Sequence, residues 1–152
     1  MDYTEKIIRL QDNLSCIRKL AGWTAEDLAE QLGVTKQTIS NIETKRTTMT
    51  KMQYIALRAV FDKRMEELED SKVLAKAVEI LVDAEDAEYS AEQFDAARRG
   101  FADAANAASA GVTGPGLAGI INSIAPFVDV AANTIAGLAA LSWLTLKDRM
   151  KK

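Results

Sequence analysis

With 152 residues, the chain is long enough for one ordinary domain or a small domain with an appendage, and 48% apolar with 27% charged residues is typical of a globular protein. It contains no histidine and a single cysteine, which excludes Cys/His zinc sites, histidine-dependent catalytic triads and intrachain disulfides. The net charge of −3 is unevenly distributed, since residues 1–65 hold 11 Lys/Arg against 8 Asp/Glu and residues 66–152 hold 8 against 14.

The first segment predicts an amphipathic helix that ends at Gly22. Cys16 falls within it between apolar neighbours, so we expect a small core residue with an inert thiol. The apolar residues of the segment recur at spacings of three and four, as one face of a helix requires: Ile7, Ile8, Leu10, Leu14, Ile17, Leu20 and Ala21.

Two short helices are predicted next, in immediate succession. Thr24 is a good N-cap for the first, acidic residues fill its first turn, and Gly33 ends it. Thr35 caps the second, which we expect over residues 36–43. Gly33 permits a tight turn between the two helices, and the following residues are expected to point inward and hold the pair together: Leu28, Leu32, Val34, Ile39 and Ile42.

A polar, basic loop at residues 44–50 leads into a fourth helix, whose apolar face is expected to carry Met52, Ile55, Ala56, Ala59, Val60 and Phe61. An amphipathic helix is predicted over residues 73–82, and Ser90 with Gln93 forms a capping-box pattern that opens a helix over roughly 91–110. Residues 111–116 break the helical pattern. We therefore predict an all-α fold with two parts, a domain of four to five helices at 1–65 and a helical region at 66–152.

Residues 14–61 resemble the Cro/C1-type (XRE family) helix-turn-helix domain of phage repressors and bacterial regulators. The run from Leu20 to Glu43 carries the resemblance, because it spans both short helices and the turn between them. The resemblance implies a lambda-repressor-like fold and sequence-specific binding of double-stranded DNA, with the helix after Thr35 as the recognition helix in the major groove. It implies a transcriptional regulator, for which we expect a repressor role.

The recognition helix is expected to read bases through Lys36, Gln37 and Asn41. Lysine suits the O6 and N7 atoms of guanine, while glutamine and asparagine can pair bidentately with adenine. Residues at the caps and in the basic loop are expected to contact phosphates: Thr24, Thr35, Ser40, Lys45, Arg46 and Thr47.

The sequence departs from the family pattern at two positions. The family often has Gln at the position of Ala25, where it anchors a phosphate, so DNA affinity is expected to depend more on the basic loop. It also tends to have Gly at the position of Lys45, where it ends the helix in a left-handed turn, so lysine suggests a different loop path. Glu43 is expected only to brace an Arg or Lys near the helix end.

Because one helix-turn-helix reads few base pairs, we expect a homodimer joined through the C-terminal helices. Residues 127–146 are long enough to span a membrane, yet Asp129 and the many alanines favour a buried or intersubunit helix.

A cytoplasmic location is expected, since the start of the chain carries no secretion pattern. The alternatives are a membrane-tethered regulator and a protein-interaction or antitoxin-like module. No cofactor, metal or enzymatic activity is expected.

Overall fold

The computed structural model describes residues 2–68, 71–85, 87–110 and 124–127, and over these residues all regular elements are helical. The prediction of an all-α fold is therefore confirmed. The helices follow one another in the order α1 (Tyr3–Leu20), α2 (Ala25–Leu32), α3 (Lys36–Glu43), α4 (Lys51–Glu67), α5 (Lys72–Val78), a π-helical turn η1 (Glu79–Asp83) and α6 (Ala91–Ala110).

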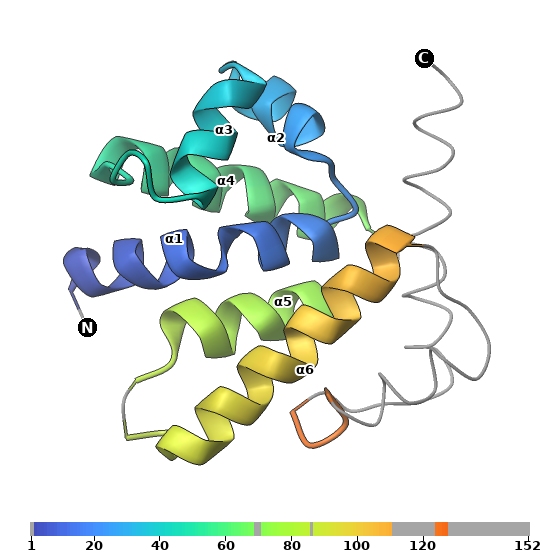
Figure 1. Cartoon of the computed structure of the whole chain (residues 1–152). Coiled ribbons are helices and arrows are strands. Elements are labelled where there is room, and N and C mark those ends of the chain that lie inside the picture. Colours follow the sequence, from blue (N-terminus) through green and yellow to red (C-terminus); the bar gives the residue numbers. More distant parts are fainter. Residues whose placement is uncertain (1, 69–70, 86, 111–123, 128–152) are drawn as a thin grey trace.

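Helix α1 is the centre of the fold. In Figure 1 it lies between α2, α3 and α4 on one side and α5 and α6 on the other, and it contacts α3, α4, α5, η1 and α6. Its fully buried residues follow the predicted spacing of three and four: Leu10, Leu14, Ile17 and Leu20. Each buried side chain of this size contributes about 1.5–3 kcal/mol to folding, so this one helix anchors both sides of the molecule.

The helices after residue 70 pack against α1 within the same chain. Ala77, Ile80 and Leu81 and, from α6, Phe101 and Ala104 are fully buried in the same hydrophobic cluster as the α1 residues. Much of the apolar surface that we assigned to a dimer contact is thus covered inside one chain. The proposed division into parts at residue 65 stays a prediction, but the hydrophobic core continues across it.

An ion pair joins α4 to η1. Arg58 donates from Nη1 and Nη2 to the two carboxylate oxygens of Asp83 over 2.5 and 2.9 Å, and Nη1 also reaches the Tyr54 hydroxyl. Burial of the guanidinium disfavours its charge, but the hydrogen bonds and charge of Asp83, with a smaller contribution from Tyr54, outweigh burial and raise the pKa of Arg58. This pair fixes α4, part of the helix-turn-helix half, to the later helices.

The apolar face predicted for α4 is wrong at most of its positions. Met52 is 81% and Ile55 50% exposed, whereas the buried positions are Tyr54, Leu57, Phe61 and Arg64. The reason is that Leu57 and Phe61 share the inner face with two amphipathic residues, Tyr54 and Arg64. Arg64, for example, lays its guanidinium 5.0 Å from the Trp23 ring centre and donates to the Ala21 carbonyl oxygen. A search for apolar residues alone therefore selects the wrong stripe.

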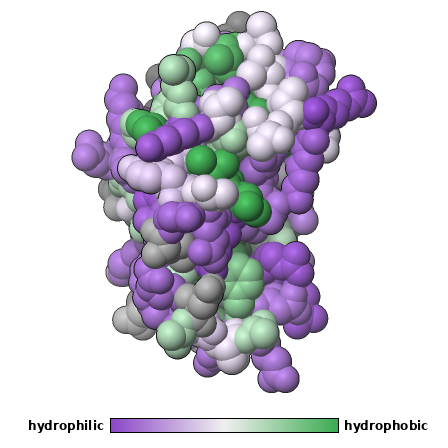
Figure 2. Space-filling model, turned by 90° about the vertical axis from the view of Figure 1, so that its left-hand side faces the viewer, coloured by the Kyte–Doolittle hydropathy of each residue, from purple (hydrophilic) through white to green (hydrophobic). Residues whose placement is uncertain are grey.

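The exposed apolar residues belong to α1, α4 and the turn before α3. Figure 2 shows the face where the amino-terminal ends of α1 and α4 lie, with apolar side chains gathered in its middle between hydrophilic ones. The large apolar side chains that are at least 41% exposed are Tyr3, Ile8, Val34, Met52 and Ile55. For Ile8 this contradicts its predicted place on the inner face of α1.

Helix α6 has the bounds predicted from sequence. The Ser90 backbone N–H donates to Oε1 of Gln93, and the Gln93 N–H donates to Oγ of Ser90, which is the predicted capping box. Residues 111–116 and nearly all of the segment 127–146 lie outside the described residues. In the described part of the chain, no helix has both the length and the apolar character to cross a bilayer.

Candidate nucleic-acid interface

Helix α2 begins at a capping box and ends at a left-handed glycine. The Asp27 N–H donates to Oγ1 of Thr24 over 3.1 Å, while the Thr24 N–H donates to Oδ2 of Asp27 over 2.9 Å. Gly33 has φ 73°, and a Cβ added there would meet no atom within 4 Å. The backbone conformation, and not lack of space, therefore requires glycine at the turn.

Helix α3 is held against the core by Ile39 and Ile42, which are fully buried. Thr35 caps it, with Oγ1 accepting from the Thr38 N–H over 3.2 Å. Val34 is 41% exposed, so its predicted inward orientation is wrong. The residue lies in the turn itself, where its N–H reaches back to the Ala29 carbonyl oxygen, and the core is filled by the residues of α3.

Two of the three expected base-reading residues contact one another. Gln37 donates from Nε2 to Oδ1 of Asn41 over 2.9 Å, one helical turn along α3. Gln37 and Lys36 are exposed, and Asn41 is half-buried. Lys36 lies at the first position of α3 and borders a surface hollow that it shares with Thr24 and Ala25. The outer face of α3 thus offers a cation and two amides.

The expected phosphate-contacting residues form one group at the start of α2 and α3 and another after α3. Thr24 and Thr35 use their hydroxyl oxygens as caps, and the Thr35 hydroxyl also bonds to the Thr38 hydroxyl over 3.0 Å. The Thr24 hydroxyl proton can be donated to another acceptor. Ser40 is half-buried, and its carbonyl oxygen accepts from the Thr44 hydroxyl over 2.8 Å. Lys45, Arg46 and Thr47 are exposed in the loop between α3 and α4.

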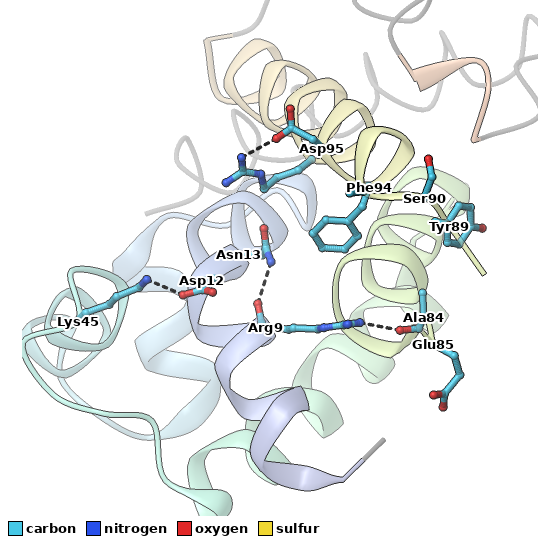
Figure 3. Close-up of a pocket in the computed structure, with 12 residues that line it drawn as sticks. Arg9, Asp12, Asn13, Lys45, Ala84, Glu85, Tyr89, Ser90, Phe94 and Asp95 are labelled. Carbon is cyan, nitrogen blue, oxygen red and sulfur yellow. Dashed lines mark hydrogen bonds and ion pairs between the residues drawn. The ribbon is translucent and has the colours of Figure 1, made fainter. Parts of the chain in front are cut away.

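Lys45 takes the backbone conformation that glycine would take. Its φ is 62°, and the Arg46 N–H bonds to the Asn41 carbonyl oxygen over 2.9 Å, so the helix ends in a left-handed turn. The expectation of a different loop path is therefore wrong. Lys45 adopts the left-handed backbone conformation, which costs about 1–2 kcal/mol of conformational strain in a non-glycine residue. Its ammonium pairs with Asp12 of α1 across the edge of a hollow of about 690 Å³ (Figure 3).

The basic loop depends on Gln11, a residue that was not among those predicted to form the interface. This α1 residue is 9% exposed, and its Nε2 donates to the carbonyl oxygens of Ile42 and Thr47 over 2.9 and 2.7 Å. Its Oε1 accepts from the Met49 N–H over 3.0 Å. One side chain therefore satisfies three backbone groups around the loop. The sequence feature that could have identified Gln11 is its place between Leu10 and Leu14, on the buried side of a helix.

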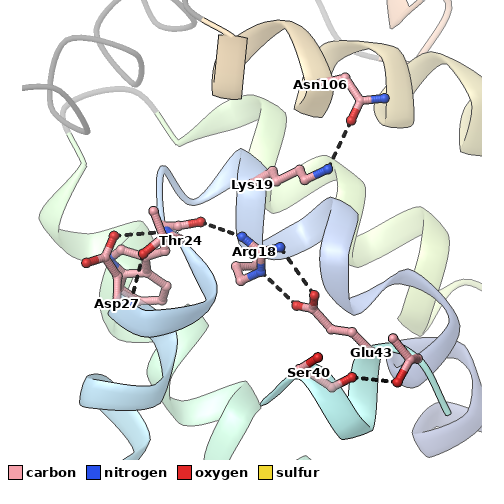
Figure 4. Close-up of polar contacts among 9 residues, drawn as sticks. Arg18, Lys19, Thr24, Asp27, Ser40, Glu43 and Asn106 are labelled. Carbon is pink, nitrogen blue, oxygen red and sulfur yellow. Dashed lines mark hydrogen bonds and ion pairs between the residues drawn. The ribbon is translucent and has the colours of Figure 1, made fainter. Parts of the chain in front are cut away.

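Glu43 braces the recognition helix through an arginine, as expected from the sequence. Arg18 donates from Nε and Nη2 to the Glu43 carboxylate over 2.7 and 3.2 Å, and from Nη1 to the Trp23 carbonyl oxygen over 2.9 Å. Figure 4 shows the bidentate pair between α1 and the end of α3. The side chains are only 11% and 13% exposed. Glu43 is the only acid of α3, so its pairing removes a negative charge from the outer face.

Cys16 fits the expectation of an inert thiol. Burial raises the pKa of the Cys16 thiol from 9.0 to about 12, against a smaller lowering by the charge of Lys19. A thiol with so high a pKa holds almost no thiolate at neutral pH, and the thiolate is the reactive form.

Residues 17–68 match the family model described as Helix-turn-helix. The match covers about a third of the chain: the last turn of α1 and all of α2, α3 and α4. It confirms the Cro/C1-type domain predicted from the sequence. Comparison with curated proteins and with solved structures gives no match.

Proposed function

We propose that this protein, whose residues 17–68 form a helix-turn-helix domain of the Cro/C1 type, is a cytoplasmic repressor that binds two half-sites in double-stranded DNA as a homodimer. The family match supports a DNA-binding regulator. Repression needs only that the bound protein occupies its site and excludes other proteins from the same DNA. Two half-sites supply the specificity that one recognition helix lacks.

The observation that carries the proposal is the chemistry of the outer face of α3. Lys36 is exposed at its first position, and Gln37 and Asn41 are joined by a hydrogen bond of 2.9 Å. A cation and amides are the groups that recognise guanine and adenine in the major groove. The one acid of the helix is turned away into its pair with Arg18, so no carboxylate of α3 opposes the approach of DNA.

The phosphate contacts follow from the two groups that flank this face. On one side, the DNA backbone would be bound by Lys45, Arg46 and Thr47. On the other side it would be bound by Thr24 and Thr35, and Ser40 within α3 would contact a phosphate as well. Lys45 would exchange Asp12 for a phosphate at little cost, because its ammonium is 62% and the Asp12 carboxylate 45% exposed. Exposed pairs of this kind contribute only about 0–1 kcal/mol.

The dimer contact is expected from the C-terminal helices. Their inner faces are buried against α1, so the contact would use the outer faces of α5 and α6 or residues outside the described part. Equilibrium sedimentation of the purified chain, with and without DNA, measures the stoichiometry. A monomer that stays a monomer on its preferred DNA would refute the dimer while leaving DNA binding intact.

The function is tested by enrichment from a pool of random duplex DNA at two salt concentrations. The full chain is compared with the variant Lys36→Ala/Gln37→Ala/Asn41→Ala, which removes all three expected base contacts from the outer face of α3. We expect a palindromic sequence to be enriched by the parent and lost in the triple variant. Binding should weaken steeply with salt, as phosphate contacts require.

The matched control is Lys63→Ala on α4. Its side chain is 71% exposed, so the substitution also removes a surface charge but leaves α3 untouched. If the parent enriches no sequence, or if the triple variant and the control enrich the same sequence, base reading by α3 is refuted. A search for protein partners would then follow. Recovery of the protein only with detergent-extracted membranes would instead favour the tethered regulator.

A further inference from the structure

The carboxyl-terminal end of α6 lies beside the helix-turn-helix. Lys19, near the end of α1, donates from Nζ to Oδ1 of Asn106 over 3.1 Å, and Figure 4 shows the two side chains pointing toward one another. One turn further along α6, Ala108 and Ser109 line a surface hollow of about 370 Å³ together with Lys36. Residues more than 70 positions apart in the sequence therefore share one surface.

The other residues of this hollow belong to the proposed DNA interface. Thr24 and Ala25, at the start of α2, form part of its wall. The family pattern places a phosphate-anchoring glutamine at the position of Ala25, and the small alanine side chain leaves that space open. The hollow is thus located where a DNA backbone would pass, and α6 forms its opposite edge.

The charges of the hollow favour an anion. Lys19 has a neutral amide as its partner, so its positive charge is not cancelled in that contact. Lys36 adds a second exposed cation, whereas Arg18 is neutralised by Glu43. Among the described residues that line the hollow, Glu26 is the single acid. Ser109 is exposed and adds a hydroxyl group, which can donate to a phosphate oxygen.

We propose that the end of α6 is part of the DNA interface, with Lys19 and Ser109 contacting the phosphate backbone beside Thr24 and Lys36. This inference rests on the proposed function, because it adds a contact to the same DNA complex. It gives the later half of the chain, which the family match does not cover, a direct part in binding. Because phosphates carry no sequence information, the contact strengthens binding to all sequences equally.

The test uses the full chain and changes the charge at Ser109 in both directions. Affinities of the parent, Ser109→Lys, Ser109→Asp and Lys19→Gln are measured by fluorescence anisotropy on the enriched duplex and on a scrambled one, between about 50 and 200 mM salt. We expect Ser109→Lys to tighten and Ser109→Asp to weaken binding by about three- to tenfold at low salt, on both duplexes. The slope of log affinity against log salt should change by about 0.9 per phosphate contact, becoming steeper for Ser109→Lys and shallower for Lys19→Gln.

Gln93→Glu is the matched control, since it adds the same single negative charge at the other end of α6 and keeps a capping-box side chain at that position. Its affinity should stay within about twofold of the parent. If the parent binds DNA but the Ser109 and Lys19 variants behave like this control, the proposed contact is refuted and the proposed function stands. If both Ser109 variants weaken binding equally, bulk and not charge matters, and the contact is refuted as well. If the parent binds neither duplex, the proposed function itself fails.

Discussion

The Gln37 amide donates from Nε2 to Oδ1 of Asn41, one turn further along α3, over 2.9 Å. This bond determines which atoms are left for another partner: the pair keeps Oε1 of Gln37 as an acceptor and Nδ2 of Asn41 as a donor. Adenine presents one donor, N6–H₂, and one acceptor, N7, in the major groove. The pair therefore matches a single adenine, and the two residues should act as one recognition unit.

Single and double substitutions test this coupling. Gln37→Ala and Asn41→Ala should each weaken binding to the preferred duplex by about tenfold or more, because a bidentate base contact is worth about 1–3 kcal/mol. The double variant should lose little more than either single variant. Dissociation constants on the preferred duplex, and on one with the contacted A·T pair replaced, measure the effect. Gln31→Ala, an exposed glutamine on α2, is the control. Additive losses that map to two different base pairs would show independent readers.

Lys45 should affect stability and DNA binding in opposite directions. Its φ of 62° is strained for lysine and ordinary for glycine. Lys45→Gly should therefore raise the free energy of unfolding by about 0.5–1 kcal/mol, the strain relief being partly offset by the greater freedom of glycine in the unfolded chain. It should also weaken DNA binding and reduce the salt slope by about one phosphate contact. Urea unfolding and salt-dependent anisotropy measure the two effects.

Lys45→Ala separates strain from charge at the same position. It removes the ammonium but keeps a Cβ, so its DNA affinity should equal that of Lys45→Gly while its stability should not rise. Equal stability of the two variants would show that the left-handed turn carries no strain. Unchanged DNA affinity in both would remove Lys45 from the interface.

The Cys16 thiol should react very slowly in the folded protein. Burial raises its pKa from 9.0 to about 12, so the folded state holds the proton more tightly than the unfolded state. At pH 8 the thiolate fraction, and with it the rate of alkylation by iodoacetamide, should be about a thousandfold lower than in denaturant. The stability contribution is complete below pH 9 and is lost as the pH rises toward 12. A folded-state alkylation rate that levels off near pH 9 would contradict this.

The local architecture was predictable because its signals act within three or four residues. Thr24, Thr35 and Ser90 each cap a helix through a bond to the residue three positions ahead, and all three caps are present. The same local patterns predicted the bounds of α3 and α6. The left-handed turn at Gly33 likewise depends on one residue whose backbone freedom is visible in the sequence.

The features of the fold that were not predicted from the sequence depend on contacts between residues far apart in the chain. The inner face of α4 was missed because Arg64 is buried through contacts with Ala21 and Trp23, about forty positions earlier. The packing of α6 on α1 was missed for the same reason, since an alanine-rich helix face predicts burial but not against which helix. At the candidate site, the exposed face of α3 was predictable, whereas the side chain that supports its loop was not.

That supporting side chain, Gln11, gives the most direct test of how the interface is held. Gln11→Leu keeps the helix and the buried volume but removes the side-chain partner of the Thr47 carbonyl oxygen and the Met49 N–H, whereas the Ile42 carbonyl oxygen keeps its bond from the Lys45 N–H. Because each unsatisfied buried group costs about 1–3 kcal/mol and the loop can relax toward water, the free energy of unfolding should fall by about 2–4 kcal/mol. Urea unfolding followed by circular dichroism measures this loss. The exposed Gln31→Leu should change stability by less than about 0.5 kcal/mol.

DNA affinity should fall with Gln11→Leu even where the protein stays folded, because the loop with Lys45 and Arg46 is no longer held against α1. A stable variant with unchanged affinity would show that the loop is positioned by α3 and α4 alone.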